Sequence, residues 1–168
     1  MILDLARLLL FPALMTFAAA TDLLTMTISN RVSLTLIVGF FVLALIVGMS
    51  GNTMLWHVGA GSVVLTVAFT CFALGWIGGG DAKLAAATAL WFGFDHLLPY
   101  LFYSSLFGGA LTLGLLSFRA MPMPPLLAGQ AWVQRLHHKD SGVPYGIALA
   151  AAALVVYPDT LWMQGTAS

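Results

Sequence analysis

The sequence contains very little charge, one cysteine and no glutamate. Only 7% of its 168 residues are charged, whereas a soluble domain usually carries about 25%. The hydrophobic share is 61% and the mean hydropathy is +0.99, so we expect an integral membrane protein. Basic and acidic residues are equal in number, which leaves no strongly basic surface for nucleic acid.

The missing residue types also exclude several kinds of site. A single cysteine, Cys71, allows neither a disulfide within the chain nor a cysteine metal cluster. Without glutamate there is no His-Glu-x-x-His motif of a metalloprotease. His137 and His138 are adjacent and point apart in a helix, so they do not form a metal site by themselves. No metal or cofactor is expected. Any carboxylate chemistry must come from Asp4, Asp22, Asp81, Asp95, Asp140 and Asp159.

Long apolar stretches predict helices that cross a bilayer. Hydrocarbon about 30 Å thick needs about 20 apolar residues per helix, and backbone groups in lipid must pair within the helix. We expect an all-α protein with about six transmembrane helices in one domain over residues 1–168. The predicted helices are Ile2–Ala20, Ser33–Met49, Val58–Ile77, Ala82–Phe94, Leu97–Phe118 and Val143–Tyr157. The first also imitates a signal peptide, although Asp4 disfavours that interpretation.

The basic residues predict the orientation, because cytoplasmic loops are rich in lysine and arginine. Arg7 is the only basic residue on the side of the membrane that holds both termini and the connections after the second and fourth predicted helices. The connections after the first, third and fifth predicted helices contain Arg31, Lys83, Arg119, Arg135 and Lys139. We therefore expect these connections in the cytoplasm and both termini outside. The only long loop covers about 119–142, and its AWVQRLHHKD stretch predicts a short helix in the headgroup region, anchored by Trp132.

Two aspartates follow predicted helices on this cytoplasmic side. Asp22 follows the first helix in AAATDLLTMTISN, and Asp81 follows the third in GWIGGGDAKL. These helices run in the same direction, so the carboxylates lie at one depth and can meet if the helices pack together. Two carboxylates in one site do not both ionise cheaply, so the pair retains a proton, which suits aspartic hydrolysis. Alternatively both are loop residues, with Asp81 as the N-cap of the fourth helix.

The residues around both aspartates resemble a known family. Gly78-Gly79-Gly80-Asp81 matches the Gly-x-Gly-Asp signature of intramembrane aspartyl proteases, and the following AKLAAATALWFG resembles type IV prepilin peptidases. Asp22 with Ile28-Ser29-Asn30 resembles the family's aspartate followed by Ile-Pro-Asn, although Ser29 replaces the usual proline. The Gly142–Ala148 stretch resembles the beginning of the family's last helix. The resemblance extends from about residue 10 to 158.

The resemblance implies roles for individual residues. Asp22 and Asp81 correspond to the catalytic aspartates, Gly78 and Gly80 to the signature glycines, and Lys83 to a basic residue common after the signature. Because glycine lacks a Cβ, we expect Gly78, Gly79 and Gly80 to let an extended substrate backbone come close. Lys83 either biases the ionisation of Asp81 or anchors its helix at the membrane edge.

The short chain and the lack of paired Cys-x-x-Cys motifs resemble the TadV/CpaA-like branch of type IV prepilin peptidases, which serves Flp-type pili. The implied protein is an aspartic endopeptidase without methyltransferase activity, multi-pass in the bacterial inner membrane. It cleaves the leader of a prepilin near the cytoplasmic face. The implied partners are the prepilin, membrane lipid and the pilus secretion machinery, with no nucleic acid and no cofactor.

Other classes of function compete with this interpretation. Asp22 and Asp81 also suit the ion or proton site of a small transporter or channel, and the chain also suits a non-enzymatic pilus assembly factor. Gly48-Met49-Ser50-Gly51 matches the Gly-x-Ser-Gly of rhomboid-type serine proteases. The partner histidine of that class belongs in a later helix, and the fifth and sixth predicted helices contain none, so we interpret this stretch as a turn.

Overall fold

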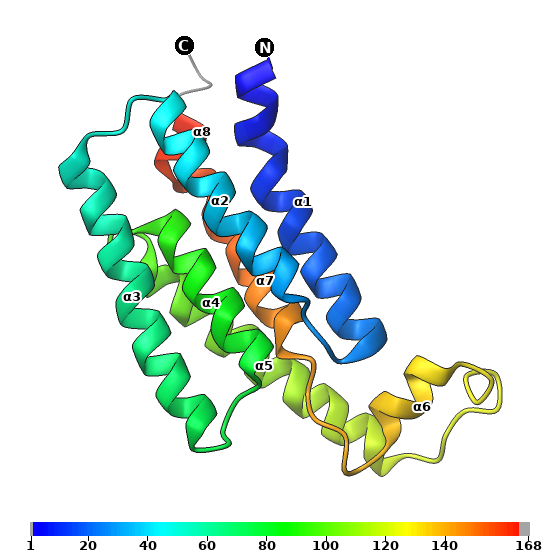
Figure 1. Cartoon of the computed structure of the whole chain (residues 1–168). Helices are drawn as coiled ribbons and strands as arrows, with labels where there is room; N and C mark the ends of the chain where they lie inside the picture. Colours follow the sequence, from blue (N-terminus) through cyan, green and yellow to red (C-terminus); the bar gives the residue numbers. More distant parts are fainter. Residues whose placement is uncertain (1, 165–168) are drawn as a thin grey trace.

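Six main helices run alternately in opposite directions in the computed structural model, which describes residues 2–164 (Figure 1). They are α1 (Ile2–Thr25), α2 (Asn30–Ile46), α3 (Gly51–Ala73), α4 (Gly79–Phe92), α5 (Leu97–Ala120) and α7 (Tyr145–Val156). Three short elements complete the described part: α6 (Ala131–His137), the 3-10 helix η1 (Tyr157–Asp159) and α8 (Leu161–Gln164). Over these residues no strand occurs, which confirms the all-α prediction.

Each predicted helix coincides with one of the main helices, but several boundaries differ. Helix α1 continues to Thr25, so Asp22 lies inside the helix and not after it. Helix α3 covers Gly51–Ala73, and thus begins and ends earlier than predicted. The short helix predicted in the long loop is confirmed as α6. By length and composition, three helices are able to cross a membrane: Leu3–Thr25 in α1, α3 and α5.

Helix α4 lies in the middle of the bundle, with α3 on one side and α7 on the other (Figure 1). It packs on α3, α2 and α7, while α7 in turn packs on α1 and α5. Every residue from Ala86 to Phe92 is buried. Five alanines in α4, at positions 82, 85, 86, 87 and 89, allow the surrounding helices to come close. The first turn of α4 is thereby held in a fixed place among its neighbours.

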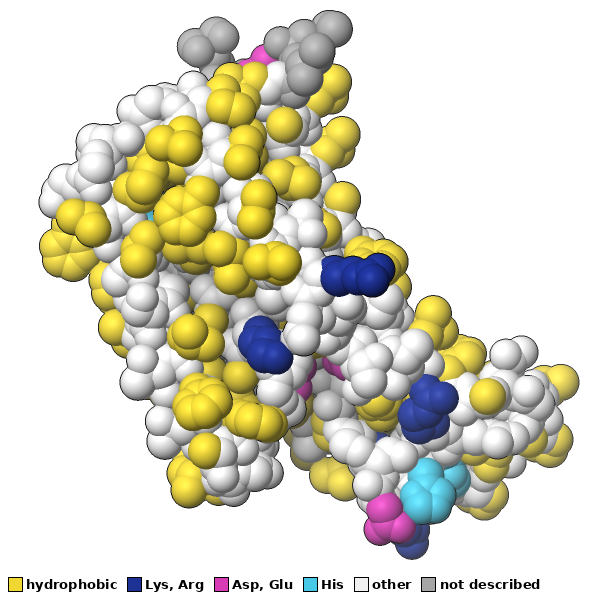
Figure 2. Space-filling view, in the orientation of Figure 1, with side chains coloured by type: hydrophobic (Ala, Val, Ile, Leu, Met, Phe, Trp, Pro, Cys, Tyr) yellow, Lys and Arg dark blue, Asp and Glu magenta, His cyan; other side chains and the backbone are white. Residues whose placement is uncertain are grey.

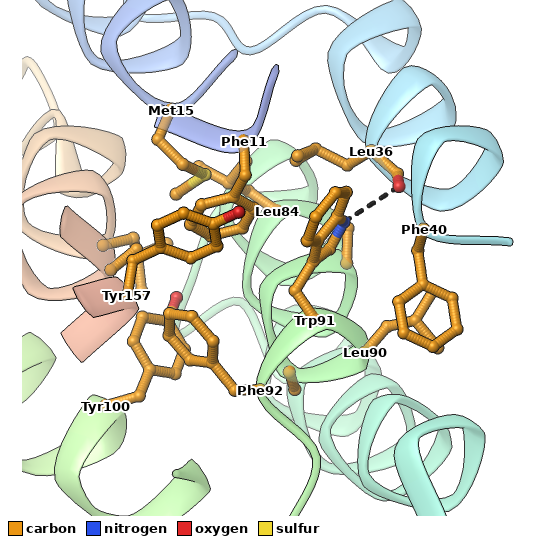
Figure 3. Packing of buried hydrophobic residues seen from close by; sticks show 14 of the residues in the cluster. Phe11, Met15, Leu36, Phe40, Leu84, Leu90, Trp91, Phe92, Tyr100 and Tyr157 are labelled. Carbon is orange, nitrogen blue, oxygen red and sulfur yellow. Dashed lines mark hydrogen bonds between the residues drawn. The ribbon is translucent and has the colours of Figure 1, made fainter. Parts of the chain in front are cut away.

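An aromatic cluster fills the bundle near the ends of α4 and α7 (Figure 3). Phe11 of α1 lies between Trp91 and Tyr157, with ring centroids 5.1 Å and 4.6 Å away. The Trp91 indole N–H donates to the Leu36 carbonyl at 2.9 Å, and the Trp162 indole N–H donates to the Trp91 carbonyl at 2.7 Å. These bonds satisfy polar groups that burial would otherwise leave unpaired. Helices α1, α2, α4 and the C-terminal elements are thus joined at this end.

The Gly48–Gly51 stretch is structural. Ser50 is the N-cap of α3, and its hydroxyl oxygen accepts a hydrogen bond from the Thr53 backbone N–H at 3.2 Å. His57, the nearest histidine along the chain, is buried, and its Nδ1 lies 2.8 Å from the Leu90 carbonyl oxygen. The serine therefore belongs to a helix cap, and its bonding gives no support to a serine protease.

Replacing Trp91 by alanine is expected to destabilise the fold by about 3–5 kcal/mol, because it empties a fully buried aromatic site. Trp56→Ala is the matched control, since Trp56 is 60% exposed, and we expect a much smaller effect there. Thermal unfolding in detergent micelles measures both. Equal losses of stability in the two variants would contradict the aromatic cluster as the centre of packing.

Candidate active site

Asp22 is buried near the end of α1, where it contacts the first turn of α7. Its side chain is 4% exposed, and its Oδ2 accepts a hydrogen bond from the Gly146 backbone N–H at 2.7 Å. Gly146 is the second residue of α7, and the first N–H groups of a helix have no partner within it. Pro144, the N-cap of α7, provides no side-chain cap. Asp22 therefore caps α7 from another helix, and the partly positive N-terminus of α7 favours a carboxylate there.

The contact with Asp22 requires a glycine at position 146. An added Cβ on Gly146 would lie 2.8 Å from Asp22 Oδ2 and 2.7 Å from the Ile28 Cδ1 atom. Both separations are too short for a carbon atom. The close approach of α7 to α1 therefore depends on the missing side chain.

Asp81 lies in the first turn of α4, three residues after the N-cap Gly78. Its carboxylate accepts a hydrogen bond from the Gly78 backbone N–H, as the third residue of a helix does in a capping box. The expectation that Asp81 is itself the N-cap is wrong, because the helix begins earlier, at Gly79. The glycine-rich turn thus positions the carboxylate through a backbone N–H.

Gly78, Gly79 and Gly80 each pack against a different group of this chain. An added Cβ would lie 2.9 Å from Asp81 Oδ2 at Gly78, 3.1 Å from the Phe72 ring at Gly79 and 3.2 Å from the Ile28 Cβ atom at Gly80. The sequence predicts that these glycines make room for a substrate. The structure shows a further reason for them, which is the tight packing of α4 against its own neighbours.

Both carboxylates line one cavity of about 620 Å³. Its walls come from the end of α1, the α3–α4 connection, the first turns of α4 and the approach to α7. They are Asp22, Met26, Gly75, Trp76, Ile77, Gly78, Asp81, Ala85, Gly142, Val143, Tyr145 and Leu149. Figure 2 shows acidic atoms recessed in the lower half of the molecule. The two aspartates that the sequence singles out therefore share one site.

The helices bring the aspartates together in a different way from the one expected. The sequence predicts a meeting through the packing of the first helix on the third. In the structure α3 packs mainly on α4, and α1 packs mainly on α7. Asp81 reaches the cavity from the start of α4, and Asp22 reaches it from the end of α1, where it is bonded to the start of α7.

The electrostatics of the cavity favour a shared proton. Asp81 precedes the membrane segment that the sequence predicts from residue 82 onward. Burial of its carboxyl group, together with the nearby charge of Asp22, raises the pKa of Asp81 to about 7, against the opposing hydrogen bond from Gly78. A carboxyl group with this pKa keeps a proton for a large part of the time at neutral pH. The pair can therefore hold one proton and one negative charge.

Lys83 lies outside this cavity. Its Nζ donates a hydrogen bond to the Asn30 side-chain oxygen at 2.9 Å, and it lines a second cavity between α2, α3 and α4. Residues two positions apart on a helix do not face the same way, so Lys83 and Asp81 occupy different sides of α4. The bond to Asn30 ties the start of α4 to the start of α2, a role that the sequence does not suggest.

The sequence also misses the residues that complete the cavity. Of the lining residues, Met26 has no predicted site role, and Val143 and Tyr145 are indicated only by the Gly142–Ala148 resemblance. His137 Nε2 lies 2.9 Å from the Met121 carbonyl oxygen. Within residues 2–164 no three His, Cys, Asp or Glu side chains are close enough to hold a metal ion.

Comparison with known proteins finds a family to which the sequence is similar. The sequence model of the type IV leader peptidase family matches residues 9–113, which is more than half of the chain. The matched stretch includes both Asp22 and Asp81, together with the glycine-rich turn. No curated protein and no solved structure matches the chain.

The contact between α7 and Asp22 predicts that Gly146→Ala lowers the stability of the fold by about 1–3 kcal/mol, the usual cost of an overpacked site. Gly129→Ala is the control, because an added Cβ there meets nothing within 4 Å. Thermal unfolding in detergent measures both variants.

The double variant Gly146→Ala with Ile28→Val shows which neighbour clashes with the methyl group added at position 146. This change removes the Ile28 Cδ1 atom but leaves Asp22 in place, so we expect only partial recovery of the unfolding temperature. Full recovery would show that the carboxylate is not held against Gly146, and would contradict the geometry described.

Proposed function

Since the chain belongs to the type IV leader peptidase family, we propose that it is an aspartic endopeptidase that uses Asp22 and Asp81 to cleave prepilins. The family makes the chain a peptidase and implies a prepilin substrate. One observation supports the aspartic mechanism most strongly: both carboxylates line the same cavity. The match with the family includes both of these aspartates.

The proposed reaction uses one carboxylate in each protonation state. The ionised carboxylate takes a proton from a water molecule, and the protonated one donates a hydrogen bond to the scissile carbonyl oxygen. We assign the proton to Asp81, because its pKa is raised to about 7. Asp22 then acts as the base, and the Gly146 N–H stabilises its charged form.

The cavity suits an extended segment of an apolar protein. Met26, Ile77, Val143 and Leu149 contribute apolar side chains close to the carboxylates. Trp76, in the α3–α4 connection, is 72% exposed and lines the same cavity. Peptide cleavage requires an unwound segment, because a helix buries its carbonyl groups in its own hydrogen bonds. We propose that the substrate enters between the α3–α4 connection and the approach to α7.

The alternation of helices supports the proposed topology. The α1–α2 and α3–α4 connections and the arm that contains α6 gather at one end of the molecule, opposite the two termini (Figure 1). Basic side chains lie in this lower half of the visible face (Figure 2). By the charge bias of cytoplasmic loops, we propose six crossings of the bacterial inner membrane, with the active site at the cytoplasmic face and both termini outside.

The proposal of a particular class of prepilin as substrate rests on the sequence alone. The resemblance to the TadV/CpaA-like branch supports a Flp-type prepilin as substrate and the pilus secretion machinery as a further partner. A transporter with an ion site at Asp22 and Asp81, and a non-enzymatic assembly factor, are the competing classes. A transporter would account for two carboxylates in one cavity but not for the match with a peptidase family, and an assembly factor would account for neither.

We predict that Asp22→Asn and Asp81→Asn each lower the rate of prepilin cleavage by roughly 10²–10⁴-fold, the usual range for loss of an acid or base. Asparagine preserves the shape of the side chain and removes proton exchange. Co-expression of each variant with a Flp-type prepilin, followed by the shift in gel mobility of the pilin, measures processing.

Two control variants separate this mechanism from its competitors. Asp95→Asn changes an acid that lies at the opposite end of α4, and Ser50→Ala removes the helix cap of α3, so both are expected to leave cleavage intact. Wild-type processing by Asp22→Asn or Asp81→Asn, with normal amounts of membrane-inserted protein, would reject the aspartate pair. Loss of cleavage in Ser50→Ala alone would instead favour a serine protease.

A further inference from the structure

A second cavity, which the proposed reaction does not use, opens between α2 and α3 beside α4. Its volume is about 580 Å³. Only residues 47–50 connect α2 to α3, yet both helices pack mainly on α4, and Figure 1 shows α4 between them. Gly61, Ala86 and Ala87 line the cavity and are small, so they leave a groove where larger side chains would fill the space.

The length of this groove fits one leaflet of a bilayer. Its wall on α2 runs from Asn30 to Phe41, which is about 16 Å at a rise of about 1.5 Å per residue. The hydrocarbon of a bilayer is about 30 Å thick, so a single leaflet measures about 15 Å. A transmembrane helix of a partner would need a groove through both leaflets. An acyl chain of one lipid needs only this length.

Polar groups are concentrated at one end of the groove. Asn30, Ser33 and Lys83 come from the first turns of α2 and α4, at the end of the bundle where the basic side chains lie (Figure 2). Beyond them the lining is apolar apart from Ser62 of α3. The Lys83 ammonium group has three donors, and the bond to Asn30 uses one of them. Two donors therefore remain for an anion at the mouth of the groove.

We propose that this groove binds a phospholipid with a net negative headgroup, with one acyl chain along α2 and α3 and the phosphate at Lys83. An ammonium group at the membrane surface attracts anionic headgroups, and the apolar groove accepts the chain that follows. The ligand comes from the leaflet on the side of the α1–α2 and α3–α4 connections. This binding site is independent of the proposed peptidase activity, because Asp81 and Lys83 face different cavities.

The test uses the full-length protein in dioleoylphosphatidylcholine vesicles that contain a small share of phosphatidylglycerol with a photoreactive group in its acyl chain. After irradiation, mass spectrometry maps the cross-linked peptides. We expect the cross-links to concentrate on Ile37, Leu65 and Ala86, and not on the lipid-facing side of α5. Unlabelled phosphatidylglycerol should compete about fivefold better than phosphatidylcholine, the preference expected for one lysine at an anionic surface.

Matched variants test separately the effect of the Lys83 charge and the effect of the space in the groove. Lys83→Gln should remove the fivefold preference, Lys83→Arg should keep it, and Lys139→Gln, a change in the exposed loop, should leave it intact. Ser62→Phe should fill the groove and reduce cross-linking of both lipids. An unchanged preference in Lys83→Gln, or cross-links spread evenly over the bundle, would overturn the proposal. Displacement of the label by a synthetic transmembrane peptide, but not by phosphatidylglycerol, would overturn it in favour of a helix-docking groove.

Discussion

The hydrogen bond from the Gly146 N–H to the Asp22 carboxylate is the contact on which the site depends. It joins residues 124 positions apart in the chain, and it places the start of α7 directly against the end of α1. The absence of a Cβ at Gly146 permits the approach, and the unpaired N–H at a helix N-terminus provides the donor. Without this contact, the approach to α7 would not form one wall of the cavity that contains both aspartates.

Ile28 connects the two halves of the site. Its side chain packs against the positions where Gly146 and Gly80 would carry a Cβ, so one residue of the α1–α2 connection lies close to the first turns of both α7 and α4. The Lys83–Asn30 bond joins the start of α2, two residues after Ile28, to the start of α4. The start of α4 therefore has two surfaces, one that presents Asp81 to the cavity shared with Asp22 and one that presents Lys83 to the second cavity, between α2 and α3.

Hydropathy and motifs predict the helical class, the approximate helices and the two aspartates. They do not predict that α1 continues past Asp22, because the prediction ends the helix with the apolar run at Ala20, although Leu23, Leu24 and Thr25 carry no stop signal. The helix ends at Thr25, and Met26 directly after it adopts a positive φ of 56°, a conformation in which glycine or asparagine is usual. The packing order also escapes sequence analysis, since a helix that is apolar on all sides does not reveal which face meets α4 or α7.

The pH dependence of prepilin cleavage tests the central claim most directly, because the two carboxylates must be in opposite protonation states. The pKa of Asp81 is raised to about 7, so its proton is lost as the pH rises through that value, while the ionised partner gains a proton at low pH. A bell-shaped profile of kcat/KM that declines above about pH 7 is the predicted result. A rate that continues to rise to pH 9, as for a serine or lysine nucleophile, would contradict the account.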